Sequence, residues 1–166
     1  MDNKQPFVES LLSKKIVLKI TDVGKNLEQN LKRKIQFLVE GKCITEGYIK
    51  PKSVQLVSQS CGLIKDDHVE FQVIYKCMVC NPPRDVEIDC TVNHVTKAGI
   101  HAQVVDEAGN VPITIFVARD HHDDNTQFEH LSEKDQIRVK VIGTRFELND
   151  TSITAIAFFI QKLYTF

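Results

Sequence analysis

Two groupings of side chains in this chain have the residue types that bind metal ions or carry out redox chemistry. The first is Cys77-Met78-Val79-Cys80, a C-x-x-C spacing found in redox pairs and in half of many zinc sites. A zinc ion would need two more ligands, and the nearest candidates are Cys90 and His94. The sequence has no second C-x-x-C, and period-two alternation puts Cys77 on the buried face of a strand. We therefore interpret these cysteines as small buried hydrophobic residues and expect no metal.

The second grouping is His121-His122-Asp123-Asp124, which has four ligand-type side chains in one polar stretch. Adjacency in sequence does not provide the geometry that a metal site or a catalytic site requires. The chain also has no G-x-S-x-G nucleophile motif, no phosphate-binding loop and no dinucleotide-binding fingerprint. The sequence therefore predicts a solvated loop at this position and a protein that is not an enzyme, without catalytic residues or cofactors.

The cysteine count and the N-terminus indicate the compartment. The chain has five cysteines, an odd number that argues against a disulfide framework. Its N-terminus lacks the layout of a secretory signal, and no apolar run approaches the roughly 20 residues that cross a bilayer. We expect reduced thiols, an intracellular protein and no membrane partner.

The charge is distributed unevenly between the two halves. Residues 1–83 hold 13 Lys and Arg against 9 Asp and Glu, a balance of +4, whereas residues 84–166 hold 8 against 13, a balance of −5. Strong nonspecific binding of nucleic acid usually requires a basic excess. Any contact between RNA and the second half should therefore be weak.

The elements of the first half are strands around one helix. Apolar residues recur at spacings of three and four from about Asn26 to Glu40, which predicts an amphipathic helix that ends at Gly41. Asn81-Pro82-Pro83 stops the last strand, because two prolines cannot donate to a ladder. We predict an N-terminal domain over residues 1–82 with antiparallel strands at 7–12, 16–20, 42–49, 53–58 and 69–77.

The second half contains five strand-like segments and a longer polar excursion at residues 119–134 between the third and the fourth. This layout is typical of the OB-fold, in which closure into a barrel removes exposed strand edges. The predicted class is α+β, with an all-β OB-type barrel over residues 83–166. Its strands are expected at 86–96, 99–105, 111–117, 136–144 and 152–160.

An ordered series of short motifs runs from about residue 7 to residue 160. It comprises Gly24, Glu40-Gly41, Gly47-Tyr48-Ile49, Gly62-Leu63-Ile64, the strand 69–76, Pro82-Pro83, the segment 92–104 with Gly99, and Ile115-Phe116-Val117. In this order the motifs resemble the seventh-subunit, or stalk, family of multisubunit DNA-directed RNA polymerases and its archaeal counterpart. The family has a tip domain followed by an S1 domain of the OB class. Thr114 and Ile115 depart from it where a glycine often stands, and the divergence is compatible with a large-DNA-virus version.

The resemblance implies a set of partners. The tip domain would dock on the polymerase core near the base of its clamp, and a helical stalk partner subunit would pack along the domain junction. The S1 domain would contact nascent single-stranded RNA. A cellular version would act in the nucleus and a viral one in the host cytoplasm or virion. The residues implied in core docking are Val23, Gly24, Gly62, Leu63 and Ile64.

Candidate RNA-binding residues follow from the OB layout, because strands two and three of such barrels present aromatic and basic side chains to bases and phosphates. Phe116 has two alternatives, a stacking platform or a core residue. The alternative function is a free-standing S1-domain RNA-binding regulator of translation or RNA turnover, but a regulator needs only the barrel. The candidates are Lys97, His101, Phe116 and Arg119, with Lys140 and Arg145 on the following strand.

Overall fold

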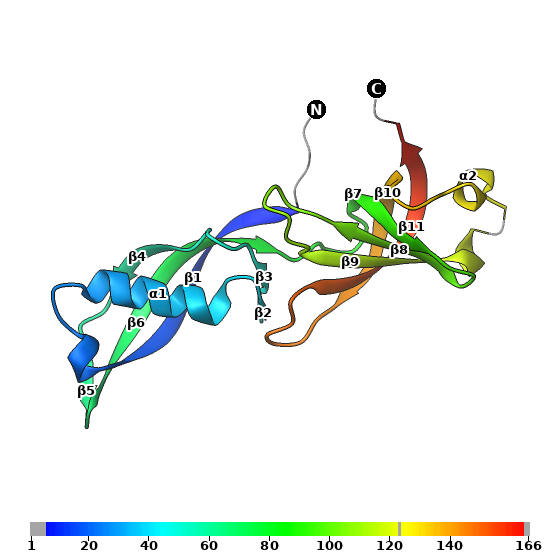
Figure 1. Ribbon diagram of the computed structural model, residues 1–166. Coiled ribbons are helices and arrows are strands. Elements are labelled where there is room, and N and C mark those ends of the chain that lie inside the picture. Colours follow the sequence, from blue (N-terminus) through cyan, green and yellow to red (C-terminus); the bar gives the residue numbers. More distant parts are fainter. Residues whose placement is uncertain (1–5, 123, 165–166) are drawn as a thin grey trace.

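The computed structural model describes residues 6–122 and 124–164 as two β units arranged end to end in an elongated molecule (Figure 1). We name the first unit, built from β1 to β6 and one helix, the N-terminal sheet, and the second unit, built from β7 to β11, the barrel. The predicted α+β class, with an OB-type barrel in the second half, is confirmed.

In the N-terminal sheet, β6 (His68–Cys80) pairs with every other strand except β2. On one side it pairs along its whole length with β1 (Phe7–Lys19), from Phe7 opposite Cys80 to Lys19 opposite His68. On the other side it pairs in turn with β3 (Gly47–Ile49), β4 (Gln55–Gln59) and β5 (Leu63–Lys65), while β2 (Cys43–Ile44) pairs with β3. The sheet order is therefore β1-β6-β3-β2, with β1 at an edge.

One helix, α1 (Leu27–Val39), covers one face of this sheet, as its apolar spacing predicts. Leu31, Ile35 and Val39 are fully buried against the alternating residues of β6. The helix is followed by Gly41 in the left-handed conformation, with φ of +68°, as the sequence indicates. It is preceded by a short 3-10 turn, η1 (Ile20–Asp22).

Three predictions for the first half are wrong in detail. β1 is one strand of 13 residues rather than two segments, because Ser13 and Lys15 lie on its outer face and leave the ladder to β6 unbroken. The segment 42–49 is a hairpin of β2 and β3 rather than one strand. Leu63 and Ile64 lie outside the predicted strands but belong to β5, because Asp66 adopts a φ of +53° that turns the chain tightly into β6.

The barrel has the predicted five strands, in the closed order β10-β11-β9-β8-β7. β9 and β11 are parallel and the other neighbouring pairs are antiparallel. The excursion after β9 holds a 3-10 turn, η2 (Arg119–His121), and the single-turn helix α2 (Thr126–Glu129). The strands are β7 (Glu87–Val95), β8 (Gly99–Val104), β9 (Ile113–Ala118), β10 (Gln136–Arg145) and β11 (Ile153–Leu163).

The two units meet at a packed joint. The Cys43 N–H of β2 donates to the Asp150 carbonyl at 2.8 Å, and the Asn149 N–H donates to the Cys43 carbonyl at 2.9 Å, so the loop between β10 and β11 continues the N-terminal sheet. Cys43, Tyr48 and Cys80 are buried with the core of the barrel. The expected boundary at Pro82-Pro83 lies between β6 and β7, and its use as a domain limit stays a prediction.

Neither helix among the described residues is long and apolar enough to span a bilayer.

Candidate docking and nucleic-acid interfaces

Figure 1 shows β5 and the turn before α1 at the end of the N-terminal sheet farthest from the barrel. Apolar side chains are exposed at this end. At this end β6 lies between β1 and β5, with Glu70 opposite both Val17 and Leu63. The four exposed side chains, between 41% and 70% accessible to solvent, lie on β1, η1 and β5, and we name them the tip patch: Val17, Ile20, Leu63 and Ile64.

Ion pairs and backbone bonds hold this end in one arrangement. The Glu70 carboxylate bridges Lys15 of β1 at 3.0 Å and Lys65 of β5 at 3.1 Å, and these hydrogen bonds lower the pKa of Glu70. The Ile20 N–H donates to the Asp67 carbonyl at 3.0 Å, which ties η1 to the turn between β5 and β6. The tip patch is therefore displayed on an ordered scaffold.

The structure places the five predicted docking residues in three different environments. Leu63 and Ile64 lie in the tip patch, and Gly24 is exposed, with open space among the described residues where a side chain would begin. Val23 is half-buried and packs on the core beneath α1. A Cβ on Gly62 would lie 2.5 Å from Val69 and 3.0 Å from the Phe71 ring, so this glycine permits close packing inside the sheet.

Sequence reasoning missed Val17 and Ile20. Val17 could have been found, because Ile16 and Leu18 are the buried residues of an alternating strand and the residue between them must face outwards. Ile20 had no such signal, since η1 interrupts the alternation after Lys19.

The outer face of the barrel carries a cluster of aromatic side chains. His101 of β8 lies opposite Phe116 of β9, with ring centroids 5.0 Å apart and an angle of 49° between the ring planes. Phe158 of β11 is 40% exposed and packs edge-to-face with His121 at 5.2 Å. We name His101, Phe116, His121 and Phe158 the aromatic face. Phe116 is half-buried on the outside of the barrel, not a core residue.

Sequence reasoning missed the contribution of β11 to this face. Its inner positions hold Ala155 and Ala157, while the larger Ile156 and Phe158 face outwards. Such an inverted alternation, with small residues inside and large apolar residues outside, was the available signal.

The basic candidates divide between the two ends of the barrel. Lys97 is exposed in the turn before β8, and the Arg119 Nη2 donates to the Thr96 carbonyl at 3.1 Å beside it. The Arg119 guanidinium also lies 5.8 Å from the Phe128 ring centroid, and its Nε is buried without a hydrogen-bond partner among the described residues. Lys97, His101, Phe116 and Arg119 therefore converge at one end of β8 and β9.

Lys140 and Arg145 lie apart from that convergence, on β10. Lys140 is opposite Phe158 in the ladder and 3.8 Å from the Asp85 carboxylate, so it flanks the aromatic face. Arg145 is opposite Thr154, nearer the joint, and its Nη2 lies 4.0 Å from the Glu147 carboxylate. The structure therefore brings four of the six predicted RNA-binding residues together, places Lys140 beside Phe158 at the margin of the aromatic face, and leaves Arg145 outside it.

The predicted loop at residues 121–124 is not uniformly solvated. His122 is buried, its Nδ1 lies 2.8 Å from the Ala118 carbonyl and its Nε2 accepts from the Phe159 N–H at 2.9 Å. These bonds fix the neutral tautomer with the proton on Nδ1 and pin the excursion after β9 onto β11. The expectation of a solvated loop is therefore wrong for His122, while Asp123 lies outside the described residues.

The cysteines of the C-x-x-C spacing do not form one site. Cys77 is buried in the core beneath α1, whereas Cys80 is buried in the core shared with the barrel. Burial raises the pKa of Cys77 to about 11 and that of Cys80 to about 12. Cys90 lies inside the barrel and burial raises its pKa to about 12, while His94 is exposed beside Glu133. Residues 6–122 and 124–164 contain no group of three side chains placed to hold a metal ion.

Comparison with known proteins gives relatives that span most of the chain. DNA-directed RNA polymerase II subunit 7 of Arabidopsis thaliana is 28% identical over 157 residues, covering 85% of this chain and 86% of the plant protein. Subunit RPB7 of Glycine max is 28% identical, covering 87% and 88%. A protein of Acanthamoeba polyphaga mimivirus named as a DNA-directed RNA polymerase subunit is 22% identical, covering 95% and 83%. This chain is a homologue of RNA polymerase seventh subunits. No family model matches it.

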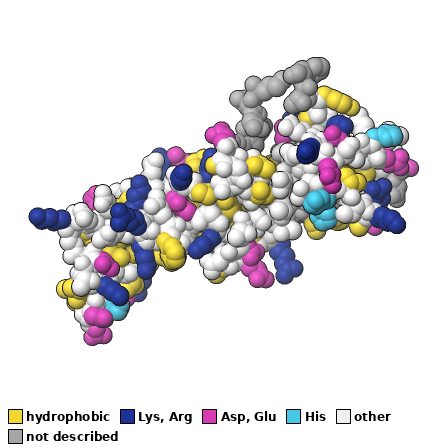
Figure 2. Space-filling model, in the orientation of Figure 1, with side chains coloured by type: hydrophobic (Ala, Val, Ile, Leu, Met, Phe, Trp, Pro, Cys, Tyr) yellow, Lys and Arg dark blue, Asp and Glu magenta, His cyan; other side chains and the backbone are white. Residues whose placement is uncertain are grey.

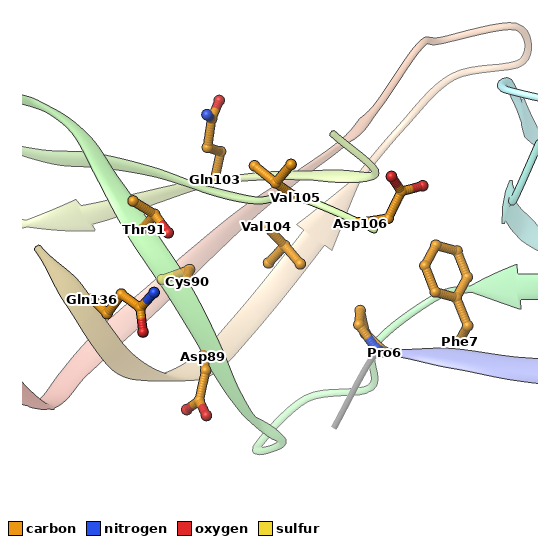
Figure 3. Close-up of a pocket in the computed structure, with 10 residues that line it drawn as sticks. All are labelled: Pro6, Phe7, Asp89, Cys90, Thr91, Gln103, Val104, Val105, Asp106 and Gln136. Atoms are coloured by element: carbon orange, nitrogen blue, oxygen red, sulfur yellow. The ribbon is translucent and has the colours of Figure 1, made fainter. Parts of the chain in front are cut away.

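The joint of this seventh-subunit homologue holds a small cavity of about 130 Å³ between the start of β1 and the barrel strands β7 and β8 (Figure 3). The Asp89 carboxylate in its wall accepts two hydrogen bonds from Arg138, at 2.7 Å and 3.1 Å. The Asp106 carboxylate accepts from the N–H groups of Ala108 and Asn110. Both acids thus have partners, and the remaining lining is Pro6, Phe7, Cys90, Thr91, Gln103, Val104, Val105 and Gln136.

Proposed function

We propose that this protein is a noncatalytic stalk subunit of a DNA-directed RNA polymerase. In this role the tip patch docks on the polymerase core at the base of the clamp, and the aromatic face meets nascent RNA. The observation that carries the proposal is the separation of two exposed surfaces at opposite ends of one packed molecule, in a chain homologous to polymerase subunits along most of its length. As such a subunit it acts in the nucleus if cellular, and in the host cytoplasm or virion if viral.

The tip patch supports the docking role. Four large apolar side chains are exposed at one end of a small sheet, and a local concentration of exposed apolar residues often marks a protein interface. The ion pairs of Glu70 hold the patch in place before any partner arrives, which reduces the entropy lost on docking.

The aromatic face supports weak RNA contact. A base stacked on an exposed aromatic ring contributes about 1–3 kcal/mol without sequence preference. Lys97 at the rim can neutralise phosphate, but the second half of the chain has a net charge of −5, which opposes nonspecific binding. The expected contact is therefore useful when the assembly holds RNA nearby and weak for the isolated subunit.

The joint supports a helical stalk partner. Phe7 is partly buried against the barrel and Val105 is exposed beside it, so an apolar side chain from a partner helix can enter the cavity between the two units. The amides of Gln103 and Gln136 in the same wall are available to pair with polar groups of that helix.

The docking role is tested by affinity purification of the tagged chain from its native source. The wild-type chain is expected to recover the large polymerase subunits, and Leu63→Asp/Ile64→Asp is expected to lose them because charge is placed in the tip patch. Val57→Asp is the control, since Val57 has a similar exposure on β4, outside the tip patch. Gly62 is left unchanged because a side chain there would disrupt Val69 and Phe71. Recovery of ribosomal or decay factors without polymerase would favour the free-standing regulator instead.

A further inference from the structure

A groove of about 600 Å³ lies between α1 and the free edge of β1, next to the tip patch. One wall is formed by three successive residues of β1, from Val17 to Lys19, and the other by one side of α1. His68 at the start of β6 closes the far end. The helix residues that line the groove are Asn30, Arg33, Lys34 and Phe37.

The β1 wall of the groove is an open strand edge. β1 pairs with β6 on one side and with no other strand of the described residues. In an antiparallel pair, alternate residues direct their N–H and C=O groups away from the partner strand. The edge therefore offers a row of backbone donors and acceptors, which an extended peptide satisfies by adding as a further strand.

The helix wall of the groove is basic and carries one large apolar side chain. Lys19, Arg33 and Lys34 are exposed, and none of them forms an ion pair with an acidic side chain in the part of the chain that the structure describes. Asp22 is the acidic residue in the lining. Figure 2 shows Lys and Arg side chains spread over this half of the molecule, in keeping with its net charge of +4.

Phe37 distinguishes this groove from an ordinary solvated helix face. Its ring is 74% exposed, and the Lys42 ammonium lies 5.1 Å from the ring centroid while donating a hydrogen bond to the Phe37 carbonyl. The Lys42 ammonium thus contacts the ring, and most of the ring surface stays exposed to solvent beside an unpaired strand edge. An aromatic side chain held in this way is a typical anchor for a partner residue.

We propose that the groove receives an extended, acidic segment of the polymerase core, which adds to the edge of β1 and places an apolar side chain on Phe37. This inference rests on the proposed docking function and names the chemistry of the core segment. A second copy of this chain is disfavoured as the occupant, because Lys14 and Lys19 on β1 form no ion pair among the described residues and would bring like charges together when two such edges pair. The lysines therefore oppose self-association of the edge and favour an acidic strand.

The first test is photo-crosslinking from the groove. The photoreactive amino acid p-benzoylphenylalanine replaces Phe37 in the full-length tagged chain, and crosslinked partners are mapped by mass spectrometry after purification from the native source. A crosslink to a segment of a large polymerase subunit with net negative charge is expected. The matched control is the same substitution at Val57, which is exposed on β4 outside the groove and should not reach that segment. Crosslinks from position 37 to a neutral or basic segment, to the stalk partner or to nothing overturn the proposal.

The second test is charge reversal at two positions inside the groove and at two positions outside it. Arg33→Glu/Lys34→Glu is expected to lower recovery of the polymerase core about tenfold, since two favourable charge pairs become repulsive. Lys25→Glu/Lys32→Glu makes the same change of charge outside the groove and should recover the core at the wild-type level. Equal melting temperatures establish that both double variants fold.

The outcomes separate this inference from the function on which it rests. Full recovery of the core by the Arg33→Glu/Lys34→Glu variant, or equal losses in both double variants, overturns the groove alone and leaves docking through the tip patch standing. Recovery of no polymerase subunit by the wild-type chain overturns both.

Discussion

The N-terminal sheet and the barrel solve the problem of strand edges in opposite ways. In the barrel, β10 pairs with β7 and closes the ladder, so that no strand edge is left along the closed order. In the N-terminal sheet, β1 keeps an open edge of 13 residues and the end near η1 exposes the tip patch. The sheet is basic and the barrel acidic, with balances of +4 and −5 for the two halves of the chain.

This difference indicates which half depends on other chains. A closed barrel satisfies its own backbone and buries its apolar residues, whereas an open edge beside exposed apolar side chains is a liability unless a partner covers it. The proposed docking function would make the sheet the half that a partner covers. The barrel can present its outer face without being completed.

The largest expected effect tests how tightly the barrel is closed. A Cβ at Gly99 would lie 2.2 Å from the Val117 carbonyl oxygen, and Gly99 has a φ of +156° that other residues avoid. Gly99→Ala should lower the free energy of unfolding by about 3 kcal/mol or more, measured by urea denaturation. Gly24→Ala, in the open region near the tip patch, should change it by less than about 0.5 kcal/mol. Similar losses of unfolding free energy in the two variants would contradict the difference in packing between the closed barrel and the open end of the sheet.

The next effect tests whether the aromatic face of the barrel binds RNA without a partner chain. Phe116→Ala should weaken binding of a single-stranded oligouridylate about fivefold in fluorescence anisotropy at low salt, because it removes a half-buried stacking surface. Leu148→Ala removes an exposed apolar side chain from the loop after β10 and serves as the control. Equal affinities of wild type and Phe116→Ala would move the RNA contact away from the aromatic face.

A smaller effect concerns an ion pair of the barrel. The Lys162 ammonium donates to the Asp135 carboxylate at 2.8 Å, and this hydrogen bond lowers the pKa of Asp135. A carboxyl whose pKa is lower in the folded state stabilises the protein above its unfolded pKa of about 4, and this stabilisation is lost as the pH falls through the folded value. Asp135→Asn should therefore cost about 1 kcal/mol at pH 7 and much less near pH 3. Asp85→Asn, which alters a longer and more exposed ion pair, should change the free energy of unfolding at pH 7 by less, measured by urea denaturation.

The smallest effect concerns the thiols. Burial raises the pKa of Cys43 and Cys77 to about 11 and that of Cys80 and Cys90 to about 12, so these four thiols stay protonated in the native state. A disulfide reagent at pH 8 should modify one thiol per native chain, at the exposed Cys61, and five after denaturation. Cys61→Ser should abolish the native reaction without changing stability. Rapid reaction of a second thiol would show that the joint or the sheet opens.

Periodicity accounts for most of what could be predicted. The alternation from Val69 to Cys77 and the helical spacing from Leu27 to Val39 each report burial on one face, so these elements and the five barrel strands were found close to their observed bounds. The prediction divided β1 into two strands, because this edge strand has polar residues in its middle. Local alternation cannot distinguish such residues from a turn. The hairpin of β2 and β3 depends on contact between Gly47 and Cys80, which are far apart in sequence.

The candidate surfaces were predicted only where residue type and strand position agree. Leu63 and Ile64 were identified, and Lys97, His101 and Phe116 converge as the OB layout implies. The partners of Arg119 and the burial of His122 could not be predicted, because both depend on how the excursion after β9 folds back onto the barrel. Such contacts are set by tertiary packing and leave no periodic trace in the sequence.

The paired hydrogen bonds between Cys43 and the Asn149-Asp150 loop have a mechanical consequence. Together with the buried Tyr48, these bonds oppose bending and twisting where the two units meet, and we expect the two units to move as one body. A partner that binds the tip patch, at the end of the N-terminal sheet, would therefore also determine the orientation of Phe116 and Phe158 on the barrel. A rotation of the N-terminal sheet would therefore rotate the barrel as well. Because the molecule is elongated, a small rotation at the tip patch would displace the rings of the aromatic face by a larger distance.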